Sequence, residues 1–326
     1  MKGRYLEKLA AVVCALTLTA GVMSGAFAKA EEPSDEPEAP ESTFVVLDPE
    51  LDDEASAADA EAAGEQIASD TEAQDLSDRP EVTDNRDTVP LLVNGQEAGE
   101  CPIRGGIPYV GVESFCRALG MNVAGGLVGD TYILAGELEL QARADDIYFT
   151  CNDRCLLAED GVFFLDGQAY LPVEAMAKCV GVSAAWDRVL WNISVTADAV
   201  YPLQSGDEFY DETDVYWLSH VIYAEAGSQS LRGRIAVGNV VLNRVVSDEF
   251  PGQDSVYDVI FEKNQFEVVV NGMIYMEPDD DAVIAAKLAL EGYDVCGGAT
   301  YFATFDFGEG YECVMWIGDH CFMVSA

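Results

Sequence analysis

Basic side chains are scarce in this 326-residue chain, in which 17 lysines and arginines stand against 59 aspartates and glutamates. The net charge of −42 excludes a nucleic-acid partner, because such binding depends on lysine and arginine contacts to phosphates. The same charge excludes electrostatic attraction to an anionic surface, so binding to such a surface must rest on specific contacts.

Histidine is scarcer still. The two histidines, His220 and His320, have no ligand spacing to a cysteine pair, which argues against a zinc site. We therefore predict neither a metal nor another cofactor. His220 stands five residues before Glu225, about 140° around a helix, so the two side chains do not share a helix face. We expect His220 to be a packed or an exposed side chain.

The apolar segment from Leu9 to Phe27 is a marginal membrane span, because threonine, glycine and serine dilute it and no stop-transfer charges follow. A basic start and small residues at Ala26-Phe-Ala28 and Ala28-Lys-Ala30 are typical of a secretory signal peptide over residues 1–30. We predict a secreted, extracellular protein, with an uncleaved anchor as the alternative.

The following segment, residues 31–88, consists mainly of Glu, Asp, Ala, Ser and Pro, and Arg79 and Arg86 are its bases. Such a composition buries too little apolar surface to offset chain entropy. We predict a disordered, extended acidic linker.

Eight cysteines follow the predicted signal peptide, and an even number in an exported protein suggests disulfides. Cys313 and Cys321 could meet across a hairpin that turns near Ile317-Gly318, and Cys151 and Cys155 could close a small loop. Five cysteines precede residue 200 and three follow it, so pairing within each part leaves some unpaired. Those would be buried free thiols.

Residues 89–198 contain an internal repeat, in which residues 109–120 align with residues 170–181. Each copy predicts a short strand, a helix that ends at a glycine, and further strands, at 131–134 and 190–195. Glu113 and Glu174 fall where the helix dipole favours acids. The pattern resembles the copper amine oxidase N-terminal-like domain, a non-catalytic stalk. The resemblance implies an α+β spacer or binding module without copper, with a wall or spore-coat protein as its candidate partner.

A polar linker over residues 199–212 leads to a helix-rich region, residues 213–326. Thr213 or Asp214 offers the cap of a first helix that ends near Gly227, and Ser230 caps a second. Further helices are predicted at 256–261 and 280–290, followed by paired strands within 299–307 and 313–324.

Glu225 lies near the end of that first helix, within Tyr223-Ala-Glu-Ala226 and among apolar residues. Partial burial and the negative end of the helix dipole both raise the pKa of a carboxyl group, as a general acid working near neutral pH requires. A solvated surface glutamate is the alternative that the local pattern leaves open.

The whole region resembles the SleB-type cell wall hydrolases, which are similar to lysozyme-like lytic transglycosylases. The resemblance is carried, in order, by residues 223–226, 236–244, 250–251, 259–260, 265–266, 271–272, 285–286, 297–298, 301–302 and 317–322. It implies a mainly α, lysozyme-like catalytic domain with a small β-hairpin, joined to the α+β stalk in a multidomain chain.

The resemblance also assigns roles to residues. It implies that Glu225 is the catalytic acid, which cleaves the MurNAc–GlcNAc bond of peptidoglycan while the C6 hydroxyl of MurNAc forms a 1,6-anhydro end. Gln265, Tyr301 and Asn271 match positions expected near the glycan, Tyr301 with core packing as the alternative, and His320 is expected to be structural. The predicted location is the cell wall or the spore cortex. A muramidase that uses water, or a non-catalytic glycan-binding protein, remains the alternative.

The chain departs from the family pattern in three places. Many relatives read Arg-Gly-Glu where this chain has Gly227-Ser-Gln229, and Asp319 stands where Asn is usual. Residues 303–310 replace a loop that contains Asn-Pro. These changes favour altered substrate binding more than a different reaction.

Overall fold

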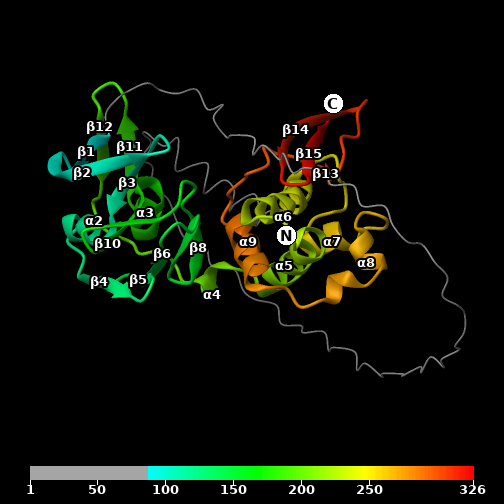
Figure 1. The fold of residues 1–326 in the computed structure, drawn as a ribbon, viewed down its shortest axis with the longest axis horizontal. Helices are drawn as coiled ribbons and strands as arrows, with labels where there is room; N and C mark the ends of the chain where they lie inside the picture. Colours follow the sequence, from blue (N-terminus) through cyan, green and yellow to red (C-terminus); the bar gives the residue numbers. More distant parts are fainter. Residues whose placement is uncertain (1–86) are drawn as a thin grey trace, which may run out of the picture. The chain divides into compact units, whose positions relative to one another are not determined.

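The computed structural model describes residues 87–326. The predicted signal peptide and nearly all of the predicted acidic linker lie outside these residues. Strands dominate the first part and helices the second (Figure 1). Each part has its own hydrophobic core, one built from residues between Val89 and Val195 and the other mainly from residues between Leu218 and Phe322. Within residues 87–326, none of the helices combines the length and apolar character that crossing a membrane requires.

The first part contains a seven-stranded sheet with the order β11-β12-β1-β2-β3-β10-β9. Strands β1 and β12 run parallel, and the other neighbours for which a register is defined run antiparallel. The strands are β1 (Thr88–Val93), β2 (Gln96–Arg104), β3 (Ile107–Gly111), β9 (Phe163–Leu165), β10 (Gln168–Pro172), β11 (Ser183–Asp187) and β12 (Asn192–Thr196).

A five-stranded antiparallel sheet with sequential order lies in the same part. It comprises β4 (Val123–Val128), β5 (Thr131–Gly136), β6 (Leu140–Arg143), β7 (Tyr148–Cys151) and β8 (Arg154–Leu157). Helices α2 (Val112–Ala118) and α3 (Val173–Val180) complete this part, and Glu113 and Glu174 lie in their first turns, as expected.

The sequence repeat corresponds to a repeated local structure. In each copy a strand leads directly into a helix, and a pair of antiparallel strands follows. Helix α3 ends at Gly181 in the left-handed conformation, with φ 66°, which a residue without Cβ adopts at little cost. The copies differ in pairing, because β4 and β5 belong to the five-stranded sheet whereas β11 and β12 join β1.

The second part begins with α4 (Gly206–Phe209) and continues with α5 (Glu212–Ala226), α6 (Leu231–Val246), α7 (Val256–Phe261), α8 (Glu267–Val270), the 3₁₀ helix η1 (Met273–Tyr275) and α9 (Asp280–Leu290). The predicted cap of the first helix at Thr213 or Asp214 is wrong. Asp211 caps α5 instead, because its side chain accepts a hydrogen bond from the Thr213 amide. Ser230 caps α6 as predicted.

Three strands follow α9, namely β13 (Tyr301–Ala303), β14 (Tyr311–Ile317) and β15 (His320–Ser325). The predicted hairpin is β14–β15, and β13 adds a third strand to the other side of β15. Cys313 and Cys321 form the predicted disulfide across this hairpin.

The loop predicted between Cys151 and Cys155 does not form, and both thiols are free. In the β7–β8 hairpin Cys151 faces Arg154 and Cys155 faces Thr150, so the two cysteines project from opposite faces of the hairpin. Accordingly, Cys151 packs in the first core and Cys155 in the second.

A buried ion pair joins strand β8 to the end of α9. Arg154 donates two hydrogen bonds to Glu291, at 2.7 and 2.6 Å, and both side chains are almost fully buried. Lys178 and the hydroxyl of Tyr210 also donate to the Glu291 carboxylate, at 2.8 and 2.9 Å. The predicted linker therefore contributes Tyr210 to a buried polar cluster.

Candidate active site

Glu225 is the second-last residue of α5, and its side chain is half-buried. Burial raises the pKa of this carboxyl group to about 6, with a further contribution from the negative charge of Glu267, the first residue of α8. The negative end of the α5 dipole acts in the same direction. Glu225 can therefore carry a proton near neutral pH, as the sequence suggested.

The backbone after Glu225 is held by Arg234, a buried residue of the second turn of α6. Its guanidinium donates hydrogen bonds to the carbonyl oxygens of Gly227 and Gln229 and pairs with Asp279. These contacts satisfy carbonyl groups in the connection between α5 and α6. Arg234 is not among the residues predicted for the site, although an arginine inside a largely apolar helix is a signal that a single sequence contains.

Two of the departures from the family pattern meet in the structure. Gln229 donates to the Asp319 carboxylate at 3.0 Å and accepts from the Asp319 amide at 3.2 Å. Compared with the family pattern, in which Glu and Asn are expected at these positions, this chain has the amide and the acid exchanged across one contact. The two hydrogen bonds between Gln229 and Asp319 connect the loop after Glu225 to the turn between β14 and β15.

Gln265 and Tyr301 come together around Arg244 in the last turn of α6. Arg244 donates to the Gln265 side chain at 3.0 Å, and its guanidinium carbon lies 5.3 Å from the centre of the Tyr301 ring. Glu225 lies before the first residue of α6, whereas Arg244 lies near its last. The first residue of α6 and Arg244 are 13 residues apart, which is about 20 Å along the helix axis. The glycan-contact roles of Gln265 and Tyr301 therefore stay predictions.

Asn271 is the C-cap that follows α8, the helix that begins with Glu267, and its side chain accepts a hydrogen bond from the Met273 amide. It lies four residues after Glu267, the acid whose charge acts on Glu225. Its role in binding also stays a prediction.

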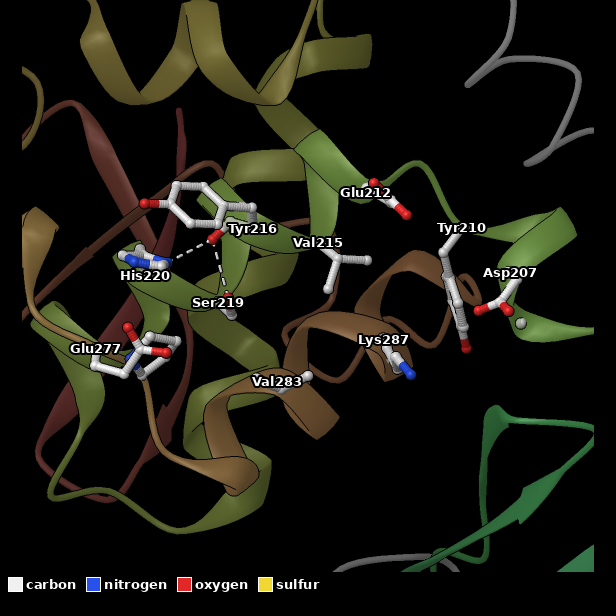
Figure 2. A pocket seen from close by; sticks show the side chains of 12 residues that line it. Asp207, Tyr210, Glu212, Val215, Tyr216, Ser219, His220, Glu277, Val283 and Lys287 are labelled. Carbon is white, nitrogen blue, oxygen red and sulfur yellow. Dashed lines mark hydrogen bonds between the residues drawn. The ribbon is translucent and has the colours of Figure 1, made fainter.

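The two histidines are buried. His320 packs against Phe302, with ring centres 5.3 Å apart, and burial lowers its pKa. His220 donates from Nδ1 to the Tyr216 carbonyl at 2.8 Å, and Ser219 donates to the same oxygen (Figure 2). In the part of the chain that the structure describes, no cluster of three or more cysteine, histidine or acidic side chains could hold a metal ion.

The fold and the site define a helix-rich domain with a small sheet and a half-buried acid of raised pKa at the end of its first long helix. Residues 228–323 match the family described as Cell Wall Hydrolase, a match that begins three residues after Glu225. This part of the chain is a cell wall hydrolase domain of the SleB type.

The relatives support the same assignment. A spore cortex-lytic enzyme of Halalkalibacterium halodurans is 43% identical over 93 residues, which are 28% of this chain and 28% of that protein. A spore cortex-lytic enzyme of Bacillus subtilis is 35% identical over 118 residues, 35% of this chain and 38% of the relative. The chain thus spans less than half the length of these relatives.

A solved structure, the catalytic domain of the Bacillus cereus SleB protein, is 34% identical and has a TM-score of 0.32. The match covers 35% of this chain and 91% of that one.

Proposed function

We propose that this protein is a secreted lytic transglycosylase of peptidoglycan, with residues 213–326 as the catalytic domain and Glu225 as general acid and base. The observation that carries the proposal is the half-buried Glu225, whose pKa burial raises to about 6, in a domain of the cell wall hydrolase family. The stalk, residues 89–198, would place this domain at the wall or the spore cortex, with a wall or spore-coat protein as its candidate partner.

The chemistry requires one carboxyl group. Protonated Glu225 donates its proton to the glycosidic oxygen as the bond from C1 of MurNAc breaks. The C6 hydroxyl of the same sugar attacks C1, and the Glu225 carboxylate accepts the hydroxyl proton. The products are a 1,6-anhydro end and a free GlcNAc hydroxyl, and Glu225 is again protonated.

One observation favours a second candidate, hydrolysis by water. Glycosidases that use water work with two carboxylates, one of which activates the water or forms a glycosyl intermediate. The charge of Glu267 acts on Glu225, so a second carboxylate is near the proposed acid. The product distinguishes the two reactions.

The test is mass spectrometry of the fragments that the protein and its Glu225→Gln variant release from purified peptidoglycan. We expect anhydro-muramyl ends from the unaltered protein alone. Reducing ends would establish a muramidase, and equal release by the variant would remove Glu225 from the mechanism. If neither protein releases fragments from wall or cortex preparations, a non-catalytic glycan-binding role replaces the proposal.

A further inference from the structure

A cavity of about 340 Å³ lies on another side of helix α5, lined by residues of α4, α5 and α9 and of the segment before α9. Tyr216 and His220 line it from α5, and Figure 2 shows both at its wall. Glu225 follows Tyr216 by nine residues, which places their side chains about half a turn apart on the helix. The cavity is therefore separate from the proposed catalytic acid.

The cavity combines an apolar middle with polar ends. In Figure 2, Val215 and Val283 lie between His220 and Glu277 at one end and Lys287 at the other. The Tyr216 carbonyl can only accept, so Nδ1 of His220 donates to it, and the acceptors at the cavity wall are the carboxylates of Asp207, Glu212 and Glu277. The cavity thus offers hydrogen-bond acceptors and one cationic donor around apolar side chains.

An aromatic surface adjoins the cavity at Tyr216. We define this surface as Tyr216, Trp217, Tyr257, Phe261 and Tyr275. Trp217 lies at its centre, with ring centres 4.8 to 6.4 Å from those of the other four. Tyr216, Tyr257 and Tyr275 remain 49%, 48% and 65% exposed, so they are not simply part of the core.

We propose that the cavity and the aromatic surface form a second saccharide-binding site, which holds pyranose rings of a glycan strand away from Glu225. This inference depends on the proposed function in one respect, namely that the bound glycan is the substrate that the enzyme cleaves. Pyranose rings expose C–H groups on their faces and hydroxyl groups at their edges. Exposed aromatic rings suit the faces, and the acceptors and Lys287 of the cavity suit the edges.

Charge supports this occupant over a polyanion. The chain carries a net charge of −42, and Glu277, Glu212 and Asp207 line the same cavity. A densely charged anionic polymer would be repelled, whereas pyranose rings are recognised by packing and hydrogen bonds that do not depend on net charge, and the isolated carboxylate of each MurNAc can lie at the Lys287 end of the cavity. A second site would keep the enzyme on a long strand between cleavage events, because linked sites raise each other's occupancy.

The test uses the full chain with Glu225→Gln, which is expected to prevent cleavage, and purified glycan strands with and without their peptide stems, in about 0.15 M salt to screen the carboxylates of MurNAc. Adding Tyr216→Ala with Tyr275→Ala should weaken binding by about tenfold. Tyr201→Ala is the matched control, because Tyr201 is 70% exposed and lies outside the cavity and the aromatic surface. Glu277→Gln changes another exposed residue of the cavity. It should weaken glycan binding less than the double variant does, and it should not affect folding.

Three results would overturn the inference. The first is unchanged glycan binding by the double variant. The second is a loss confined to strands that keep their peptide stems, which would make a peptide the occupant. The third is unchanged glycan binding with a loss of self-association in sedimentation, which would make the surface an interface between two copies.

The proposed function is tested separately, by fragment release from the chain with intact Glu225. In that chain, the double variant should raise KM on long strands and leave kcat unchanged.

Discussion

At the scale of the single residue, Glu225 combines a functional requirement with a cost in stability. Its pKa is about 6 in the folded protein against an ordinary 4.5, and burial is the larger cause. The folded state therefore holds the proton more tightly than the unfolded chain, and the contribution of Glu225 to stability falls as the pH rises from about 4.5 through about 6.

We accordingly predict that Glu225→Gln abolishes activity but stabilises the protein by about 1–2 kcal/mol at pH 7. At pH 4 the carboxyl group is mostly protonated in both states, and the stability of the variant should approach that of the unaltered protein. Urea unfolding at the two pH values measures the difference. A variant that is less stable at pH 7 would contradict the burial argument.

Glu267 is predicted to contribute to the alkaline limit of activity, through its effect on the pKa of Glu225. Removing its charge by Glu267→Gln should lower the pKa of Glu225, because Glu267 is one of the two causes that raise it. The alkaline limb of the kcat/KM profile should then move to lower pH, although not as far as the ordinary value, since burial remains.

The profile of fragment release against pH measures this shift. Glu312→Gln, at an exposed position on β14, is the control and should leave the limb in place. An unmoved limb in Glu267→Gln would show that burial alone sets the pKa of Glu225.

At the scale of the elements, the loop after α5 depends on a contact that two sequence departures build together. Gln229→Glu would set its carboxylate against that of Asp319 in place of the present hydrogen bond. We predict a loss of about 0.5–1.5 kcal/mol in stability and reduced activity.

Adding Asp319→Asn should recover both, because the amide and the acid are then exchanged back. A double-mutant cycle in urea, with fragment release as the second readout, measures the coupling. Additive losses from the two substitutions would contradict a direct role for the pair.

Breaking the buried ion pair between Arg154 of β8 and Glu291 at the end of α9 is predicted to cost more stability than breaking the partly exposed pair between Arg232 and Glu159. Burial acts to raise the pKa of Glu291, but Arg154 and Lys178 outweigh it and lower the pKa. The stabilisation is therefore present above the ordinary value of 4.5 and is lost as the pH falls through the lowered value.

Glu291→Gln leaves buried Arg154 without its counter-charge, and we expect a loss of about 3 kcal/mol. Arg232→Gln removes a partly exposed pair with Glu159 at 3.0 Å and should cost less than about 1 kcal/mol. Chemical unfolding at pH 7 compares them, and equal losses would refute the role of burial.

At the scale of the whole molecule, the net charge of −42 predicts an unusual salt response. The screening length falls from about 30 Å at 0.01 M salt to about 8 Å at 0.15 M, so added salt weakens repulsion from an anionic wall. Binding of the Glu225→Gln chain to intact walls should therefore increase with salt.

Co-sedimentation with walls, before and after removal of their anionic polymers, measures this response. Stripped walls should show little dependence on salt. Binding that decreases with salt on intact walls would indicate attraction through a local basic surface.

The sequence by itself determined the elements whose signals are local. The spans of α6, α7 and α9, the cap of α6 at Ser230, the copies of the repeat, and the disulfide partners Cys313 and Cys321 follow from residues close together in the chain. Short-range hydrogen bonds and side-chain spacing decide such features, so a single sequence contains them. The role of Glu225 came from the family resemblance and stays a prediction.

The tertiary structure decided what depends on residues far apart in the sequence. Only packing could bring Glu267 to Glu225, Arg244 between Gln265 and Tyr301, and Gln229 to Asp319. The opposite projection of Cys151 and Cys155 follows from the β7–β8 register. The cavity and the burial that raises the pKa of Glu225 arise in the same way, because burial is a property of the assembled core.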